Sequence, residues 1–320
     1  MSGNSSFTTL ITSTLQNFGQ EIFDNVVTNN ALLNILQKSG NIKVVAGGRS
    51  FTHPLRHRLN DTFAARAKLT AIPLTLQDHI TRAEYGIKVV DGSIALDEIE
   101  LAMNAGSREK LIDLAEEMKE SAIISMSETM GDQVFNTSAG ANDLDGIPRL
   151  IATVPSAQTD VGGIDSTGNS YWRNQVYATA VTAFGTGQAG LNAMATLYNA
   201  CLFGRQGPTC IITTKAVMTL YELSLTANAR YTSMDKGDGG FKTLVYAQIP
   251  MYFDDNCPSG RMYFIDTESM LLQVLKEANM KITPMQQTQD QLTKSALVYS
   301  ALNITTGQRR TSGVIASITG

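Results

Sequence analysis

The segment TRAEYGIKV, residues 81–89, alternates along the chain between charged and uncharged side chains. The uncharged positions are Thr81, Ala83, Tyr85, Ile87 and Val89. The charged residues between them are Arg82, Glu84 and Lys88. A period of two residues predicts a β-strand that turns one face inward and the other outward.

The residues around this strand have the turn signals of a long extended hairpin. Gly47-Gly48 and Pro54 interrupt any helical period, and Asn60-Asp61 is a turn signal. We therefore predict a hairpin that runs out and back over residues 46–90. A hairpin of this length is difficult to place within one compact domain, so we expect it to lie on a neighbouring subunit.

A long helix is predicted over residues 107–135. Ser107 is a suitable N-cap, and Glu109 lies in the first turn, where the helix dipole favours an anion. The apolar positions recur every three or four residues, at Leu111, Leu114, Met118, Ala122, Met126, Met130 and Val134. Such a stripe favours packing against a core over a cofactor site. We expect the helix to end near Asn136.

Charge is segregated between the hairpin and the helix region. From Lys43 to Lys68 there are six bases and one acid, and from Asp91 to Asp132 there are eleven acids and three bases. We expect contact between subunits, with basic candidates Arg49, Arg56, Arg58, Arg66 and Lys68. The acidic candidates are Glu109, Asp113, Glu116, Glu117 and Glu120. The alternative is that both segments are solvated faces of one chain. Single exposed ion pairs contribute less than about 1 kcal/mol, so many copies have to act together.

The remaining chain mixes short helices and strands, and the fold class is therefore α+β. Helices are predicted over residues 188–203 and 215–225, and a buried strand over 209–213. A polar, glycine-rich loop is predicted over 232–241 and a junction over 249–260. Strands are predicted over 261–266 and in the tail 296–318. ALVYSALNI, residues 296–304, is apolar on both faces, as in a strand covered on both sides.

The N-terminal segment, residues 7–27, has an apolar stripe at nearly helical spacing and an uncharged polar opposite face. The stripe includes Phe7, Ile11, Leu15, Phe18 and Ile22. It indicates either an amphipathic arm that packs on a partner surface or an ordinary first helix packed in the chain's own core.

FGTGQAGLN, residues 184–192, contains the G-x-G-x-x-G pattern of dinucleotide-binding loops. Such a site requires a strand before it, a helix after it and an acidic residue about 20 positions further on. No Asp or Glu occurs between Asp165 and Glu222. Arg205 is the one residue in this region whose charge would favour the 2′-phosphate of NADP. We favour a glycine-rich entry into a helix, and an NADP-dependent oxidoreductase is the alternative.

Other catalytic or metal-binding chemistry is sparse in the sequence. His53 and His57 lie in a segment predicted to be extended, where four residues span about 13 Å, too far for one metal ion. His79 has no ligand-like neighbours in the sequence. The three cysteines fit no metal or disulfide spacing, and we expect free thiols in a reducing cytoplasm. We therefore expect neither enzyme activity nor a cofactor or metal.

Composition restricts the partners. A net charge of −4 argues against a dedicated nucleic-acid binder, which needs a dense cationic face. No run of about 20 apolar residues is present to cross a membrane. No Lys or Arg precedes Lys38, so no secretory signal is expected.

The order of these parts resembles the major capsid proteins of tailed bacteriophages, which have the Hong Kong 97-type fold. The resemblance covers nearly the whole chain and rests on the joint order of several segments. They are NNALLNILQKSGNIKVVAGGRSFTHPL (29–55), EYGIKVVDGSIALDEIELAMNAGSREKLIDL (84–114), LDGIPRLI (144–151), SYWRNQVY (170–177), TCIITTKAVMTLYE (209–222) and IPMYFDDNCPSGRMYFIDTESM (249–270).

The resemblance implies a role for each part of the chain. Residues 1–45 would be an N-terminal arm and 46–90 the extended loop. The peripheral domain would comprise residues 91–145, with its spine helix at 107–135, and the returning strands of 251–320. Residues 146–250 would form the axial domain.

The resemblance also implies a function and partners. The chain would assemble into hexamers and pentamers of an icosahedral shell around double-stranded DNA, which it would contact weakly and without sequence preference. A separate scaffolding protein and a portal are expected, and no membrane. The chain would be located in the virion capsid, after assembly in the bacterial cytoplasm. An encapsulin-like compartment is a further alternative, since it has the same fold.

Overall fold

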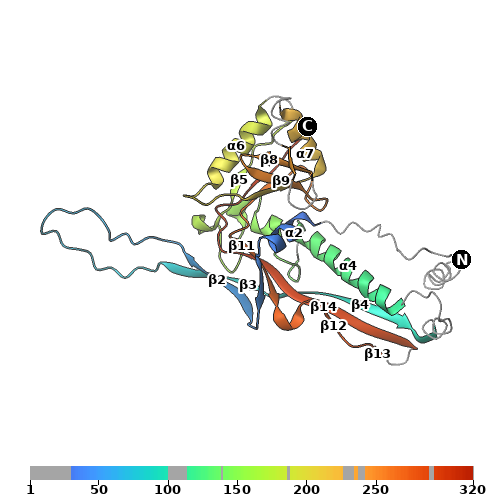
Figure 1. Ribbon diagram of the computed structural model, residues 1–320. Helices are drawn as coiled ribbons and strands as arrows, with labels where there is room; N and C mark the ends of the chain where they lie inside the picture. Colours follow the sequence, from blue (N-terminus) through green and yellow to red (C-terminus); the bar gives the residue numbers. More distant parts are fainter. Residues whose placement is uncertain are drawn as a thin grey trace.

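The fold contains two β-sheets with their helices and a hairpin that projects far from both (Figure 1). The computed structural model describes residues 30–99, 114–137, 140–185, 188–225, 234–236, 242–287 and 292–319. The shape is elongated, with the hairpin extending from the body on the opposite side from the far end of the first sheet (Figure 1).

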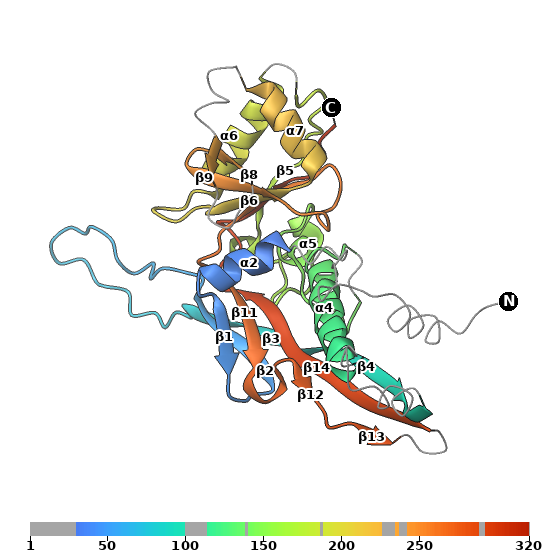
Figure 2. The same ribbon diagram turned by 45° about the vertical axis from the view of Figure 1, so that its right-hand side comes forward.

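The first sheet is built around β14 (Thr293–Thr306), the longest strand. The strands that join it are β1 (Ile42–Val45), β4 (Lys88–Asp97), β11 (Met270–Leu275), β12 (Lys281–Ile282) and β13 (Gln286–Gln287). β14 and β4 pair antiparallel from Thr293↔Asp97 to Leu302↔Lys88. This long two-stranded ladder extends away from the second sheet (Figure 2).

Helix α4 (Leu114–Val134) lies along one face of this ladder (Figure 2). Its buried side chains Met126, Met130 and Val134 join the core that contains the inward residues of β4 and β14. The prediction that the methionine stripe packs in a core is therefore confirmed. The helix ends within two residues of the predicted position, and the predicted start at Ser107 lies outside the described residues.

Helix α2 (Ala31–Lys38) connects the N-terminal segment to the body. Leu32 and Leu36 are completely buried, and the side chain of Asn30 caps the helix by accepting from Leu33 N at 3.0 Å. The buried carboxylate of Asp254 accepts from Ala31 N at 3.1 Å, although it lies more than 200 residues away in the sequence. A carboxylate at a helix N-terminus satisfies free N–H groups and complements the dipole.

The second sheet has the order β5-β15-β10-β6-β9-β8-β7. Its strands are β5 (Gln175–Tyr177), β6 (Cys210–Thr213), β7 (Met234–Lys236), β8 (Lys242–Tyr246), β9 (Ile249–Phe253), β10 (Met262–Ile265) and β15 (Gly313–Ile315). Helices α6 (Ala189–Cys201) and α7 (Lys215–Ser224) contribute Met194, Leu197 and Tyr221 to its core. Both helices agree with the predicted ranges.

Short helical turns lie in the connections. They are α5 (Ile147–Leu150), η1 (Pro155–Ala157), η2 (Ser170–Trp172) and η3 (Lys276–Ala278).

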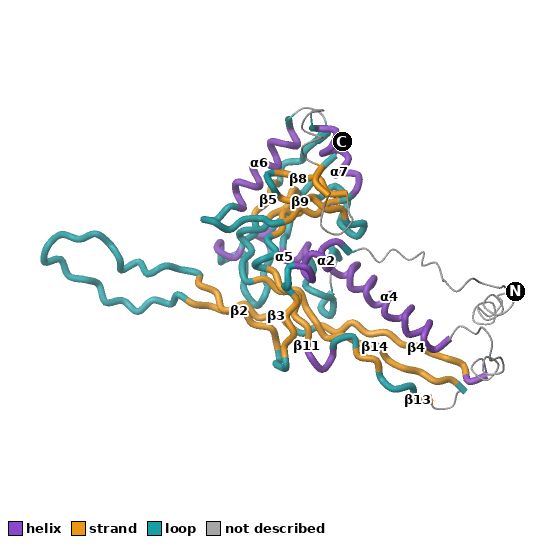
Figure 3. Tube along the Cα trace, in the orientation of Figure 1, coloured by secondary structure: helices purple, strands orange, loops and turns teal. Residues whose placement is uncertain are grey.

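The projecting hairpin is a separate two-stranded sheet of β2 (Ser50–Arg56) and β3 (Ile80–Gly86). Its register runs from Ser50↔Gly86 to Arg56↔Ile80. Residues 57–79 continue beyond the strands as a long open loop (Figure 3). The predicted out-and-back path is therefore confirmed.

Some expectations about the strands were wrong. Val89 is not on the inward face of Tyr85, because Ile87 separates β3 from β4 and reverses the phase; Val89 is 55% exposed. The predicted junction at 249–260 contains β9, an internal strand of the second sheet, and the predicted loop at 232–241 contains β7. β14 is covered on both faces only in its second half, since Leu297 is exposed.

The returning segment 251–320 also differs from expectation, because it contributes to both sheets. Strands β11 to β14 join the first sheet, whereas β10 and β15 pair in the second. The reason is burial: every residue of β10 and β15 is buried, and alternate side chains of these strands enter the first and the second core.

Candidate intersubunit surfaces

The root of the hairpin is fixed in the body of the protein. Phe51, Leu55, Ala83 and Tyr85 form the inward face of β2 and β3 and are buried in the first core. The hydroxyl of Tyr85 donates to Thr306 O at 3.1 Å. This confirms the predicted alternation over residues 81–85 and gives the hairpin a rigid base.

A turn at residues 161–164 closes over this base. Glu84 N donates to Gly162 O at 2.8 Å. Gly162 has a φ of +61°, and a Cβ there would lie 2.9 Å from the ring of Tyr85. Glycine is needed at this position both for the backbone conformation and for the close approach of the ring.

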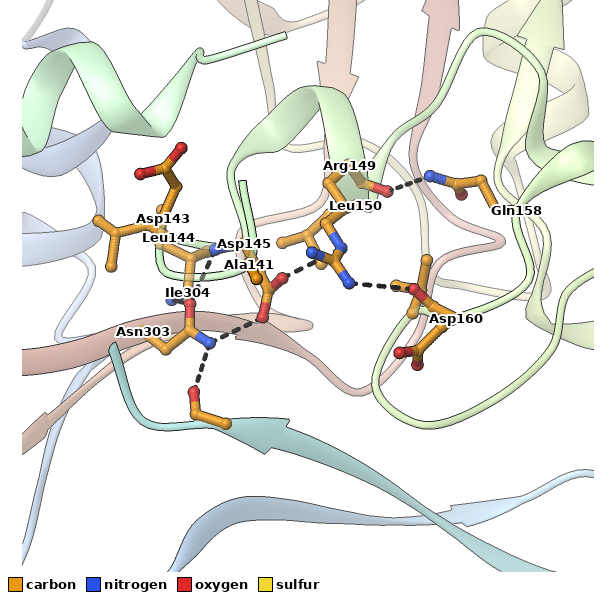
Figure 4. A network of polar contacts seen from close by, with 12 residues as sticks. Ala141, Asp143, Leu144, Asp145, Arg149, Leu150, Gln158, Asp160, Asn303 and Ile304 are labelled. Carbon is orange, nitrogen blue, oxygen red and sulfur yellow. Dashed lines mark hydrogen bonds and ion pairs between the residues drawn. The ribbon is translucent and has the colours of Figure 1, made fainter. Parts of the chain in front are cut away.

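A buried polar network links the hairpin, the first sheet and the connection to the second sheet (Figure 4). Asn303 Nδ2 donates to Gly86 O at 2.7 Å and to Asp145 Oδ2 at 2.8 Å, and Asn303 Oδ1 accepts from Asp145 N at 3.0 Å. Arg149 pairs with the other carboxylate oxygen of Asp145 at 3.1 Å. Because both polar atoms of the Asn303 amide and both oxygens of the Asp145 carboxylate have partners, this network stabilises one geometry where the three parts meet.

Arg309 forms a second buried hub. Its five N–H groups all donate to neutral oxygens, those of Leu150 O, Trp172 O, Ser166 Oγ, Gln158 Oε1 and Asn174 Oδ1. Burial lowers the pKa of Arg309 to about 10, so the side chain stays charged at neutral pH. Sequence reasoning did not identify Asn303, Asp145 or Arg309, because their partners are distant in the sequence.

The outer part of the hairpin exposes an unusual number of apolar side chains. We call the following residues the apolar tip set: Leu59, Phe63, Leu69, Ile72, Leu74, Leu76 and Ile80. Leu69, Leu74 and Leu76 are 105%, 98% and 101% exposed, so the chain itself covers almost nothing of them. This set was not predicted from the sequence, although the alternation of Ile72, Leu74 and Leu76 was a usable signal. Apolar patches of this extent mark interaction sites.

The basic candidates of the hairpin are all on the surface. They are Arg49, Arg56, Arg58, Arg66 and Lys68. Their contacts within the chain are local: Arg58 pairs with Asp61, and Arg66 Nη2 donates to Thr62 O at 2.8 Å. The structure therefore leaves these charges available to another molecule.

The acidic candidates are only partly described. Glu120 is exposed on α4, where Glu128 and Asp132 are exposed further along the helix. The side chains of Glu116 and Glu117 are not described, and Glu109 and Asp113 lie outside the described residues. The arm residues Phe7, Ile11, Leu15, Phe18 and Ile22 lie outside them as well.

Two glycines of the motif, Gly185 and Gly190, lie in close contacts at the entry to α6, and Gly187 lies outside the described residues. A Cβ on Gly190 would be 2.6 Å from Phe184 O, and a Cβ on Gly185 would be 3.2 Å from the side chain of Leu220. No strand leads directly into α6, since β5 ends at Tyr177. These glycines therefore serve close packing at the entry to α6, as predicted, and the geometry lacks the strand–loop–helix arrangement of a dinucleotide site.

Metal ligands, membrane spans and reactive thiols are considered for the described residues, 30–319 with the gaps given above. No group of three or more His, Cys, Asp or Glu side chains is arranged to hold a metal ion there. No helix in those ranges is long and apolar enough to cross a membrane. Cys201, Cys210 and Cys257 are buried free thiols.

Comparison with known proteins gives no match by sequence, either to a protein-family model or to a curated protein. Similar structures nevertheless cover nearly the whole chain. The capsid asymmetric unit of Cyanophage A-1(L) is similar with a TM-score of 0.69 at 16% identity, over 95% of this chain and 97% of that one. The capsid of the native GTA particle is similar with a TM-score of 0.66 at 9% identity, over 99% and 100%.

An encapsulin is also similar, the SrpI encapsulin complex from Synechococcus elongatus PCC 7942. Its TM-score is 0.58 at 9% identity, over 96% of this chain and 94% of that one. At these identities the likeness concerns the fold. This chain therefore has the capsid-protein fold of tailed bacteriophages, in agreement with the Hong Kong 97-type fold that its sequence resembles.

Proposed function

We propose that this chain is the major capsid protein of a tailed bacteriophage and has a structural rather than an enzymatic role. It assembles into hexamers and pentamers of an icosahedral shell that encloses double-stranded DNA. The observation that carries the proposal is the hairpin: its base is buried in the first core, whereas its apolar tip set is exposed to solvent.

A second copy of the chain is the partner that fits the hairpin best. Tyr85 and the Asn303 network fix the base of the hairpin, which a flexible linker does not require. The hairpin also exposes seven large apolar side chains, which indicates that a partner covers them. In a head-to-tail ring each subunit offers one surface and receives a different one. A projecting hairpin and the neighbouring body supply such a pair of surfaces.

Charge supports one part of the receiving surface. The exposed bases of the hairpin are complementary to the exposed acids of α4, of which Glu120, Glu128 and Asp132 are described. We propose that the hairpin bases contact the acidic region around α4 of the next subunit, including Glu109, Asp113, Glu116 and Glu117. Complementary charges of this kind set encounter and register more than raw affinity.

The division of the chain follows from this function. We propose that the first sheet with α4 forms the peripheral domain and the second sheet with α6 and α7 the axial domain near the capsomer centre. The arm expected over residues 1–45 is restricted by α2 and β1, which are packed in the body, since Leu32 and Leu36 are buried and β1 pairs with β11. A separate scaffolding protein and a portal are the expected partners during assembly in the host cytoplasm, and the packaged DNA is held by weak, non-specific contacts.

Charge reversal tests the contact. The variant R56E/R58E/R66E is expected to remain folded, because these side chains are exposed, but to lose assembly. The matched variant R56K/R58K/R66K keeps the charge and is expected to assemble. Restored assembly of the combined variant R56E/R58E/R66E/E116K/E117K/E120K, in which both surfaces are reversed on every subunit, would identify the acidic partner. Unchanged assembly of the reversed variant would reject the charge pairing. The proposal of a shell would then rest on contacts made by the apolar tip set.

An encapsulin-like compartment is the second candidate, since the similar SrpI encapsulin shows that the fold also serves such a shell. The contents of purified particles separate the two. Nuclease-protected double-stranded DNA supports the phage capsid, and a co-purifying cargo enzyme without DNA supports the compartment. A rise in melting temperature with millimolar NADP would instead support the oxidoreductase alternative.

A further inference from the structure

All three histidines of the chain lie at the root of the hairpin, on one face of it. His53 is opposite Ala83 in the β2–β3 register, and His57 follows four positions further out, directly after the last pair Arg56↔Ile80. His57 N donates to His79 O at 3.1 Å, so these two residues are directly opposed on the next rung. Residues two apart in a strand share a face. Phe51 and Leu55 of the same face are buried, so the histidines face the body.

His53 joins the hairpin to the first sheet. Its Nε2 lies 2.9 Å from Thr305 Oγ1 on β14 and 3.1 Å from Gln273 Nε2 on β11. Its ring meets Tyr85 edge-on, with 6.1 Å between ring centroids. Burial, and then the positive charge of Lys43 on β1, hold the pKa of His53 below its ordinary value of 6.5.

His57 and His79 occupy the last rung before the open loop. The ring of His57 lies against Tyr171, with 5.2 Å between centroids. Nδ1 of each ring is buried and has no hydrogen-bond partner. Directly opposed residues of a hydrogen-bonded pair have Cα atoms about 5.5 Å apart, so two charged imidazoles on this rung would repel each other.

No charged group described near these rings is placed to stabilise the positive charge of a protonated imidazole. Arg56, Arg58 and Asp78 adjoin the rung in sequence but alternate to the opposite face of the hairpin, and all three are exposed. Within the described part of the chain, no carboxylate hydrogen-bonds to or pairs with any of the three rings. Lys43, Tyr85 and Tyr171 are the other titratable neighbours, and none of them carries negative charge at neutral pH.

We propose that the histidine root of the hairpin is an acid-sensitive hinge, in which the neutral imidazole of His53 holds the hairpin against β11 and β14 and its protonation releases it. A released histidine takes up a proton more readily than His53 does in the closed root. The free energy by which neutral His53 favours the closed root is therefore fully present above about pH 6.5. It is lost as the pH falls below that value. This inference concerns the single chain and does not depend on the proposed function.

Hydrogen exchange of backbone amides in β2 and β3 tests the hinge on the full-length, unassembled chain. Between about pH 7.5 and pH 5.5, after correction for intrinsic exchange, we expect a several-fold loss of protection, with about tenfold as the limit for one histidine whose ordinary pKa is 6.5. Amides of β6 and β10 serve as an internal reference and should keep their protection. Equal protection of the hairpin amides at both pH values would overturn the proposal.

The variant H53Q/H57Q/H79Q is the matched control, because glutamine is neutral at both pH values and keeps hydrogen-bonding capacity. Its β2 and β3 amides are expected to change by less than about threefold over the same range. A loss equal to that of the unchanged chain would refute the role of the histidines. If the variant does not fold, NMR titration of the unchanged chain decides: His53 should titrate below 6.5, and titration at or above that value would overturn the proposal.

Discussion

Replacing three leucines of the apolar tip set with serine, as L69S/L74S/L76S, should abolish assembly without affecting the fold. These leucines are almost completely exposed in the single chain, so the substitutions remove no packing within it. Surface substitutions of this kind change the free energy of unfolding by no more than about 0.5 kcal/mol. The isolated variant should therefore unfold at the same denaturant concentration as the unchanged chain.

The effect on the contact follows from the same exposure. Burying one leucine side chain stabilises by about 1.5–3 kcal/mol, so three leucines covered by a neighbour contribute about 4.5–9 kcal/mol to each hairpin contact. Since 1.4 kcal/mol corresponds to a factor of ten, the association constant of that contact should fall by roughly three to six orders of magnitude. A shell repeats the contact many times, so the loss should prevent closed particles from forming.

Sedimentation velocity over a protein concentration series measures this effect directly. The control L69M/L74M/L76M keeps the apolar area and should assemble at nearly the concentration that the unchanged chain requires. Assembly of the serine variant at an unchanged concentration would refute the reasoning, because it would show that no neighbour covers these leucines. Unfolding of the isolated serine variant would also contradict it.

Further predictions concern the interior. Arg309→Met should lower the free energy of unfolding by about 2–6 kcal/mol, because Leu150 O and Gln158 Oε1 lose their donor at about 1–3 kcal/mol each; a loss below 1 kcal/mol in urea denaturation would contradict this. Gly190→Ala should cost about 1–3 kcal/mol by the same measurement, since the new Cβ meets Phe184 O, a backbone atom that yields little. An unchanged midpoint would show that the backbone adjusts freely. Burial raises the pKa of Cys201 and Cys210 to about 12, so at pH 8 almost no thiolate is present and iodoacetamide should modify them only after denaturation. Rapid alkylation of the folded chain would contradict this burial.

Local periodicity was sufficient to predict the elements that position the candidate surfaces. The methionine stripe identified α4, and the alternation around Tyr85 identified the inward face of β3. Both signals are produced by one core and one element, so they are present in a short window of sequence. The order of these elements then indicated the fold.

Features that depend on register and on distant partners were not predictable in this way. His79 has no ligand-like neighbour in the sequence and stands opposite His57 only once the β2–β3 register is known. The prolines of the segment 249–260 concealed β9, whose burial depends on strands from other parts of the chain. The contact between Asn303 and Asp145 could not be predicted, because the two residues are distant in the sequence and meet only once β14 is in place.

The measurement that tests the central claim most directly is electron microscopy of the purified chain, alone and together with its scaffolding partner. The account predicts closed icosahedral shells built from rings of six and five subunits, with hairpins lying across neighbouring subunits. A chain that remains monomeric, or that forms only small oligomers at every concentration and salt condition with and without the scaffold, would contradict it.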